Sequence, residues 1–341
     1  MGRRVTIQQV AVRAGVSAST VSRTLHNHPR ISDETKQRVI EAAEALNYRP
    51  GSPFLASGGA QFIAVILPAT TPDLARHPFF ASVLQGISRA AQQAGYYPSY
   101  AYAGSDDSRI ETVNEYLKTP AVRGFVLVAA YVEDRCLDYL VESDAHLCVI
   151  GRPGRSDGVQ WVDNDNFHAS YDAATVLIEH GLRKIAFLGG PSQMNVTRDR
   201  FEGFRMALAN RGLHQHPPLI AYADEFSEDG GKRAMAAVLE SEIPDGLIAS
   251  DDFLAMGAEH ALRDRGLEMI PMIGFNNTKW GPQTGPPFSS VEIFPEELGS
   301  NAARLLINSI EQTAVEEDHL VVPTRIVLRG ALAASSDVRV S

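Results

Sequence analysis

Apolar residues recur at helical spacing in three short segments at the start of the chain. Over residues 7–14 they share one face, and Gly15 follows where a helix should end. Ser17 can cap a second helix after a turn of about three residues. Within that helix Val21 and Leu25, four positions apart, can face the first. The spacing predicts a helix-turn-helix pair.

Residues at the helix starts agree with this interpretation. Thr6 stands where the first helix needs an N-cap. Ser32 opens a third helix whose first turn holds two acids, where carboxylates favour the helix dipole. The apolar stripe of this helix runs over residues 39–46. Three such helices can share one small core, which predicts a helical domain over residues 1–49.

The exposed face of the second predicted helix is small, polar and cationic. Arg23 lies on this face, and an Arg side chain can bond the O6 and N7 atoms of guanine in a major groove. The alternative is a helical subdomain that touches no DNA. Charge argues against it, because residues 1–50 carry a net charge of about +4, while the whole chain is −10 and the remainder about −14. A basic head on an acidic body indicates phosphate contact by the head alone.

Six apolar runs in the rest of the chain alternate with segments of helical periodicity. The runs, each bounded by Gly, Pro or Asp, are FIAVILP, FVLVAA, LCVIG, KIAFLGG, GLIAS and IPMIGF. Helical spacing is clear over residues 80–95 and 201–212, both of which end at glycine. This alternation predicts parallel sheets, and about 280 residues exceed what one core usually serves. We therefore expect a doubly wound α/β body of two lobes.

Three stretches of the head resemble the lactose/galactose repressor (LacI/GalR) family: TIQQVAVRAGVSASTVSRTL, ISDETKQRV and LNYRP. The resemblance continues through most of the chain. It implies an N-terminal all-α helix-turn-helix domain, a two-lobed periplasmic-binding-protein-like α/β domain with parallel sheets, and a homodimer on a palindromic operator. The stretch GFNNTKWGPQTGPPFSSVEIFPEELG is similar to the maltose-type repressors of this family.

The resemblance also divides the chain. It implies a helix-turn-helix domain over residues 1–49, a hinge over 50–61, and an effector-binding and dimerisation domain over 62–341. Within that domain the expected lobes are about 62–160 with 291–323, and about 161–290 with 324–341.

The expected hinge departs from the family pattern. In the family this stretch becomes a short helix on DNA, and a Leu, here Leu55, wedges into the minor groove. Gly51 stands where Asn is usual, Pro53 interrupts the segment, and the segment is about two residues short. The alternative is that Leu55 packs on the body. The residues expected to contact DNA are Thr6, Ile7, Ser17, Ala18, Ser19, Thr20, Ser22, Arg23, His26, Ser32 and Leu55.

Polar residues follow several predicted strands, at the positions where ligands of open α/β sheets bind. They are Asp163, Asn164, Asp251, Asp252, Asn276 and Asn277. The resemblance assigns inducer binding to Arg198, while Arg200 is expected to pair with an acid. Acids, an Arg fork and aromatic rings together suit a sugar, although each ring could be ordinary packing. The expected effector-binding residues are Phe79, Asp163, Asn164, Arg198, Phe226, Asp251, Asn276 and Trp280.

Other classes of protein find little support in the sequence. Cys136 and Cys148 lack the CxxC or Cys/His spacing of a metal or redox site, so we expect neither metal nor cofactor. Consecutive acids such as Asp251 and Asp252 point apart, and no catalytic motif accompanies them, so we expect no enzyme. An 18-residue apolar stretch and a signal-peptide pattern are both missing, which predicts a cytoplasmic protein without a membrane partner.

Together these patterns predict a transcriptional regulator that binds operator DNA as a homodimer and responds to a small sugar. A repressor of carbohydrate-utilisation genes, with maltose or a related glucoside as effector, is the specific expectation. The alternative is a cytosolic sugar receptor, or a sugar-acting enzyme with a helical N-terminal domain. The tail ALAASSDVRVS has no leucine heptad, so nothing in it indicates a tetramer.

Overall fold

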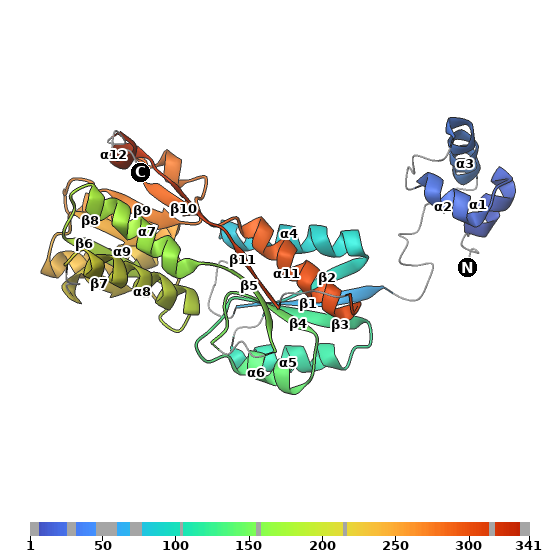
Figure 1. Cartoon of the computed structure of the whole chain (residues 1–341), viewed down its shortest axis with the longest axis horizontal. Helices are drawn as coiled ribbons and strands as arrows, with labels where there is room; N and C mark the ends of the chain where they lie inside the picture. Colours follow the sequence, from blue (N-terminus) through green and yellow to red (C-terminus); the bar gives the residue numbers. More distant parts are fainter. Residues whose placement is uncertain are drawn as a thin grey trace. The chain divides into compact units, whose positions relative to one another are not determined.

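The structure is a computed structural model of the whole chain, which forms two compact units, residues 1–60 and residues 61–341 (Figure 1). We call them the head and the body. The structure describes residues 7–25, 32–45, 60–68, 77–102, 105–154, 158–213, 217–313 and 318–334.

The described part of the head consists of three helices around a small apolar core. They are α1 (Ile7–Ala14), α2 (Ala18–Leu25) and α3 (Asp33–Ala45). Val10, Val21 and Val39, one from each helix, are fully buried against one another. Gly15 ends α1 with a φ of +64°, a conformation that glycine adopts without steric cost. Ser17 caps α2 by accepting a hydrogen bond from the amide of Thr20 at 3.1 Å, as the spacing predicted.

The first lobe of the body is a six-stranded parallel sheet between two helical layers. Its strand order is β11-β5-β4-β3-β1-β2. Helices α4 and α11 pack on one face, and α5 and α6 pack on the other. The elements are β1 (Gln61–Leu67), α4 (Pro78–Ala94), β2 (Tyr96–Tyr102), α5 (Asp106–Leu117), β3 (Val122–Val128), α6 (Arg135–Glu142), β4 (Leu147–Ile150), β5 (Gln160–Asn164), α11 (Pro295–Ile310) and β11 (His319–Val322).

The second lobe repeats this architecture with one antiparallel strand. Its strand order is β12-β10-β9-β8-β6-β7, and only β12 runs against its neighbour. Helices α7 and α8 cover one face, and α9 and α10 cover the other. The elements are α7 (Asn166–Glu179), β6 (Ile185–Gly189), α8 (Asn195–Asn210), η2 (Pro217–Leu219), β7 (Ile220–Tyr222), α9 (Glu228–Ser241), β8 (Gly246–Ala249), α10 (Asp252–Asp264), β9 (Met272–Phe275), η3 (Gly281–Gln283), β10 (Ser289–Glu292), β12 (Arg325–Val327) and α12 (Gly330–Ala334).

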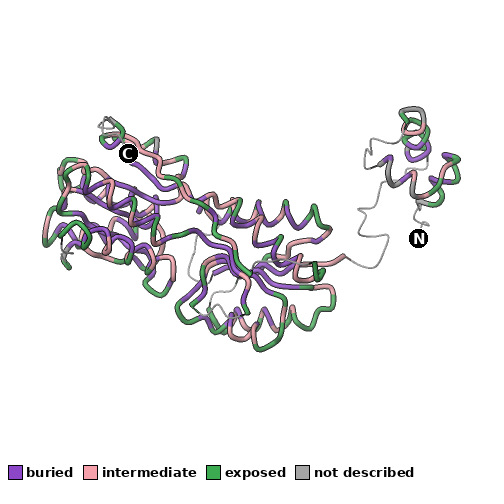
Figure 2. Tube along the Cα trace, in the orientation of Figure 1, coloured by how far each residue is buried: buried purple, intermediate pink, exposed green. Residues whose placement is uncertain are grey.

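The chain crosses between the lobes after β5, between β10 and α11, and between β11 and β12. One buried side chain joins these crossings. The amide of Asn164, at the first crossing, donates to the carbonyl oxygen of Ile293 at 3.0 Å and to that of Val322 at 2.9 Å. Of the strands at these crossings, β5 and β10 are buried along most of their length, whereas β11 and β12 are mostly exposed or half-buried (Figure 2).

Most of the expected elements are present. All six apolar runs form strands, and the two-lobed fold class is confirmed. The sequence placed the first crossing near residue 160, but β5 belongs to the first sheet and the crossing follows Asn164. It also began α8 at Phe201, whereas the helix starts at Asn195. Thr6 and Leu46, expected as a cap and a core residue, lie outside the described residues.

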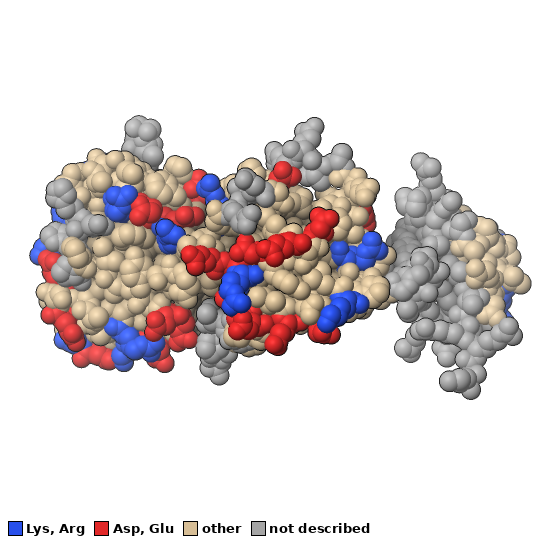
Figure 3. Space-filling model, turned by 90° about the horizontal axis from the view of Figure 1, so that it is seen from below, with Lys and Arg blue, Asp and Glu red and all other residues tan. Residues whose placement is uncertain are grey.

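The surface agrees with the acidic composition of the body. Asp and Glu side chains gather along the face of the body shown in Figure 3, with Lys and Arg between them. Among the described residues no helix is long and apolar enough to cross a membrane.

Candidate functional site

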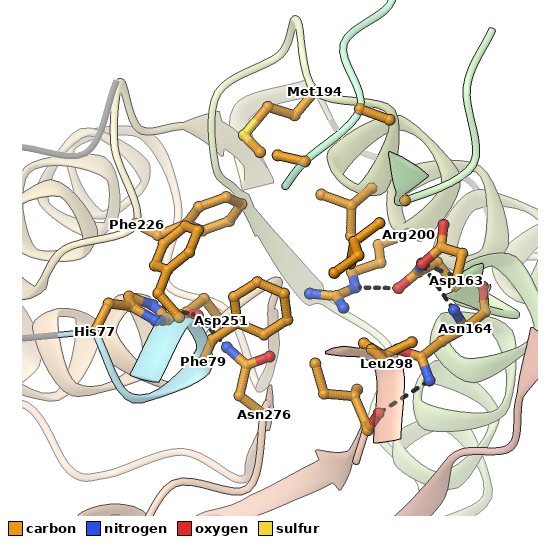
Figure 4. Close-up of a pocket in the computed structure, with 18 of the residues that line it drawn as sticks. His77, Phe79, Asp163, Asn164, Met194, Arg200, Phe226, Asp251, Asn276 and Leu298 are labelled. Carbon is orange, nitrogen blue, oxygen red and sulfur yellow. Dashed lines mark hydrogen bonds and ion pairs between the residues drawn. The ribbon is translucent and has the colours of Figure 1, made fainter. Parts of the chain in front are cut away.

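A cavity with a volume of about 90 Å³ lies between the two lobes of the body and is partly open to solvent (Figure 4). The first lobe contributes the start of α4 and the carboxyl ends of β4 and β5. The second contributes α8 and the segments after β6, β7, β8 and β9. Of the eight expected effector-binding residues, six line the cavity: Phe79, Asp163, Asn164, Phe226, Asp251 and Asn276.

Arg200 supplies a buried cation to the wall of the cavity. Its Nε donates to Asn166 Oδ1 at 2.9 Å, and its Nη1 donates to the carbonyl oxygen of Ser250 at 2.6 Å. Burial lowers the pKa of its guanidinium to about 10, so the side chain stays charged at neutral pH. In the described part of the chain its Nη2 has no hydrogen-bond partner and no acid forms an ion pair with it. The guanidinium can therefore still bond ligand oxygens.

Asp163 anchors the same end of the cavity. Its carboxylate accepts hydrogen bonds from the amides of Arg152 at 2.8 Å and Asn164 at 2.7 Å, and from Asn166 Nδ2 at 2.9 Å. Burial nevertheless raises its pKa to about 6. Through Asn166, Asp163 orients the guanidinium of Arg200. These three side chains form one polar network across β5, α7 and α8.

Asp251 lies at the other end of the cavity, at the N-terminus of α10. Its Oδ1 caps the helix by accepting from the amide of Phe253 at 2.7 Å. Its Oδ2 lies 3.0 Å from Nε2 of His77 and accepts from Nδ2 of Asn276. Asn276 holds this position with a φ of +90°, which Asn tolerates better than most residues.

Asp252 does not share this environment. Its carboxylate accepts from Ser290 Oγ at 2.6 Å and from the amide of Thr278 at 2.6 Å, behind the cavity wall. Burial, together with the neighbouring charge of Asp251, raises its pKa to about 7. The two consecutive acids therefore have separate partners and do not face one ligand.

Aromatic rings form the apolar wall. Phe79 packs against the cores of both lobes, and its ring lies edge-on to Phe80 at 5.2 Å between centroids. The ring of Phe226 covers Gly190, where an added Cβ would come within 2.1 Å of a ring atom. Glycine is thus required for this ring to reach the cavity. A cavity with aromatic faces and a polar network at one end suits a sugar, whose C–H faces pack on rings while its hydroxyls bond polar groups.

Backbone hydrogen bonds bridge the lobes on the opposite side of the cleft. The amide of Val132 donates to the carbonyl oxygen of Gln193 at 2.9 Å, and the amide of Asn195 donates to that of Ala130 at 3.1 Å. Tyr131 pairs with Met194 between them. Together with the contact between His77 and Asp251, these bonds hold the lobes in a closed arrangement.

Comparison with known proteins agrees with this geometry. Residues 6–51 match the family described as "Bacterial regulatory proteins, lacI family", and residues 174–332 match "Periplasmic binding protein-like domain". The HTH-type transcriptional regulator MalR of Streptococcus pneumoniae is 34% identical over 276 residues, which cover 80% of this chain and 84% of MalR. The chain belongs to the lacI family. The resemblance found in the sequence is confirmed.

Further relatives of this LacI-family chain extend the match over nearly its whole length. The HTH-type transcriptional regulator CelR of Thermobifida fusca is 29% identical and covers 96% of this chain and 98% of its own. A solved structure described as "transcriptional regulator CelR-cellobiose complex" superposes with a TM-score of 0.73 at 28% identity, covering 96% of this chain and 99% of that one. These relatives are transcriptional regulators.

Two expected effector residues of this LacI-family chain lie away from the cavity. Arg198 is exposed, and Arg200 lines the cavity in its place. The two are separated by two helical positions, about 200° around α8, so they cannot face the same side. Arg200 also bonds an amide and a carbonyl instead of the acid expected for it. Trp280 lines a second hollow, where the ammonium group of Lys279 lies 4.7 Å from its ring centre.

Eight of the eleven residues expected to contact DNA lie within the described part of the head. Ser17 and Ser32 are exposed at helix starts, and Ala18 and Thr20 are half-buried on α2. Those that lie in helices but whose side chains are outside the described part are Ile7, Ser19, Ser22 and Arg23. Those wholly outside the described residues are Thr6, His26 and Leu55.

The sequence analysis missed several cavity residues of the LacI-family body, among them His77, Asn166 and Glu225. A signal for His77 existed, because it directly precedes the Pro-Phe-Phe start of a predicted helix. Asn166 and Glu225 lie beside the expected residues Asn164 and Phe226, but the apolar pattern does not indicate that their own side chains reach the cavity. Within the described ranges no group of three or more His, Cys, Asp or Glu residues could hold a metal ion.

Proposed function

We propose that this LacI-family protein is a sugar-responsive transcriptional repressor that binds a palindromic operator as a homodimer, with one head on each half-site. Carbohydrate-utilisation genes are the proposed targets. The cytoplasm is the proposed compartment, because both DNA and the sugar must be reached.

The observation that carries the proposal is the composition of the cavity. One end offers a buried guanidinium with a free Nη2 beside the network of Asp163 and Asn166, and the wall offers the rings of Phe79 and Phe226. An Arg fork can bond two adjacent hydroxyls of a pyranose. We propose Arg200, rather than Arg198, as the principal polar contact with the effector, and we retain Phe79, Asp163, Phe226, Asp251 and Asn276 as further contacts. A glucoside such as maltose or cellobiose is the proposed ligand class.

For the head, the proposal keeps α2 as the helix in the major groove. Its start is exposed and capped by Ser17, so the residues that follow the cap can approach base edges. Arg23 is the proposed base-reading residue, and Leu55 in the hinge is the proposed wedge in the minor groove.

No catalytic step is part of the proposal. The adjacent acids that could suggest a glycosidase, Asp251 and Asp252, have different partners and only Asp251 lines the cavity. Hydrolysis by a carboxylate pair needs both groups to flank one bond.

Fluorescence anisotropy of the purified full-length protein on DNA from upstream of its own gene tests the proposal. We expect saturable binding to one site at fixed salt, and release by one sugar of a panel led by maltose and cellobiose. A scrambled DNA of equal length is the control for charge-driven binding. Equal affinity for both DNAs would contradict the proposed repressor function. Specific binding that no sugar changes would contradict the proposed class of effector.

A further inference from the structure

His77 reaches across the cleft from the first lobe to the second. It immediately precedes α4, and its ring is only 5% exposed. Nε2 lies 3.0 Å from Oδ2 of Asp251, at the start of α10 in the second lobe. The ring also meets the ring of Phe253 edge-on at 5.0 Å between centroids. Within its own lobe the ring also meets Phe80 edge-on at 5.7 Å. The hydrogen bond to Asp251 and one of the aromatic contacts therefore cross between the lobes.

The carboxylate of Asp251 is largely occupied by the protein itself. Oδ1 accepts from the amide of Phe253, and Oδ2 accepts from His77 and Asn276. A carboxylate offers about four acceptor positions, so about one remains for a ligand. Two of the three bound donors come from the second lobe, and His77 comes from the first. Asp251 thus connects the lobes more than it offers a free acceptor.

The ring of His77 has no other polar support. Its second nitrogen, Nδ1, is buried and has no hydrogen-bond partner among the described residues. The contact with Asp251 is then the one polar interaction in the described part of the chain that orients the ring. On the opposite side of the cleft, backbone bonds join residues 130–132 to residues 193–195. The side chain of Asn195 adds bonds from Nδ2 to the carbonyl oxygens of Tyr131 at 3.3 Å and Arg152 at 2.9 Å.

We propose that His77 is the positioning residue of the effector cavity: through Asp251 it holds the start of α10 against the start of α4 and keeps the cleft closed. Removing the donor at Nε2 leaves a buried carboxylate short of one partner in the closed state, while in the open state water replaces the lost bond. The variant should therefore populate the open state. This inference uses the cavity of the proposed function but needs no knowledge of the ligand.

Distances between spin labels on the two lobes test the proposal in the full-length protein. The labels replace Glu142 on α6 and Glu240 on α9, both exposed, and the two native cysteines are buried. Labelled chains are diluted into unlabelled protein, so that only distances within one chain are measured. The wild-type distribution should be narrow and match the closed lobes, without any sugar.

His77→Phe is the main variant, because it keeps an aromatic ring beside Phe253 and removes both nitrogens. We expect the ratio of closed to open molecules to fall about tenfold, the effect of losing one charge-assisted hydrogen bond. His77→Gln places an amide donor near the original Nε2 and should restore most of the closed population. His77→Ala, which removes the ring, replaces His77→Phe if the larger side chain prevents folding.

A matched control exists in the second lobe. His168 lies 2.7 Å from Asp165 in an exposed pair within one lobe, so His168→Ala should leave the distances unchanged. Unchanged distances in both His77→Phe and His77→Ala would overturn the proposal, as would a Gln variant as open as the Phe variant. Because the distances are read without sugar, a failure here differs from a failure of the effector assignment, which appears only in the DNA-release assay.

Discussion

Arg200 is the residue at which the sequence prediction and the structure differ most clearly. It shares the buried face of α8 with Gly203, Phe204 and Ala207, while Arg198 is exposed. Helical periodicity counted back from Phe204 reaches Arg200 but not Arg198. A buried, charged side chain with a free donor in a cavity is costly unless a ligand uses it. This placement makes Arg200 the residue on which the effector response should depend.

Arg200→Ala should weaken sugar binding at least about tenfold, because it removes charge-assisted hydrogen bonds to the ligand. Operator affinity without sugar should stay within about threefold of wild type. Isothermal titration with the sugar found active in the release assay measures the first quantity, and anisotropy measures the second. Arg198→Ala is the matched control and should bind sugar normally. Equal losses in both variants would contradict the assignment.

Asp252 carries a pH dependence of stability. Burial raises its pKa from the ordinary 3.8 to about 7, so the folded state binds a proton more tightly than the unfolded state. Its contribution to stability is therefore full below about pH 4 and is lost as the pH rises to about 7. In Asp252→Asn the free energy of unfolding should fall less steeply with pH over this range. The change in slope corresponds to at most about one bound proton, and urea unfolding at several pH values measures it.

The contribution of Asp264 to stability has the opposite pH dependence. It is exposed, and the ammonium group of Lys232 lowers its pKa, so its contribution appears only as the pH rises. Asp264→Asn should leave the decline between pH 4 and 7 in place. Part of the decline should persist in Asp252→Asn, because burial also raises the pKa of Asp163 to about 6. A slope as steep as that of the wild type in Asp252→Asn would contradict the prediction.

At the scale of elements, the sequence predicted the central strands and missed the edges. The six apolar runs became β1, β3, β4, β6, β8 and β9, which are buried along most of their length. The missed strands include β2, β7, β11 and β12, which lie at sheet edges and consist mostly of half-buried and exposed positions. A half-exposed strand of three to seven residues leaves little apolar pattern. The cavity was predicted in part, because polar residues at strand ends can be found from the apolar runs, whereas Arg200 and Asn166 on helices α8 and α7 follow no such run.

Helix α2 carries the prediction for the head. Arg23→Ala should lower affinity for the operator by about 1–3 kcal/mol, because a bidentate contact with guanine is lost. Discrimination against an operator changed at one base pair of each half-site should fall with it, which a loss of phosphate contact alone would not cause. Anisotropy on both operators at one salt concentration measures this. A uniform loss on the two DNAs would assign Arg23 to the backbone instead.

At the scale of the whole molecule, one amide side chain joins the three crossings between the lobes. Asn164 holds the carbonyl oxygens of Ile293 and Val322, so three distant stretches of the chain meet at one point. Nothing in the apolar pattern reveals this role, because the partners are backbone atoms more than 120 residues away. The sequence placed Asn164 in the effector site, and the structure shows that both donors of its amide are already used.

Asn164→Ala should lower the free energy of unfolding of the body by about 1–3 kcal/mol, because two buried carbonyl groups lose their donor. Asn210→Ala, which removes one exposed bond to Tyr171, is the matched control and should change it by no more than about 0.5 kcal/mol. Urea unfolding followed by circular dichroism measures both. Equal changes in the free energy of unfolding for the two variants would show that the hydrogen bonds of Asn164 do not stabilise the crossings.

The closed cleft implies that the lobes open before a sugar binds. His77 and Asp251 bridge one side of the cavity, and the backbone pairs around Tyr131 and Met194 bridge the other. We expect a sugar to enter only after the lobes part, because both bridges narrow the cleft around the cavity. The observed binding rate should then stop rising at high sugar concentration, and its plateau should equal the rate at which the lobes open. After a sudden rise in sugar concentration, the response would then be limited by the rate at which the lobes open and not by diffusion of the sugar.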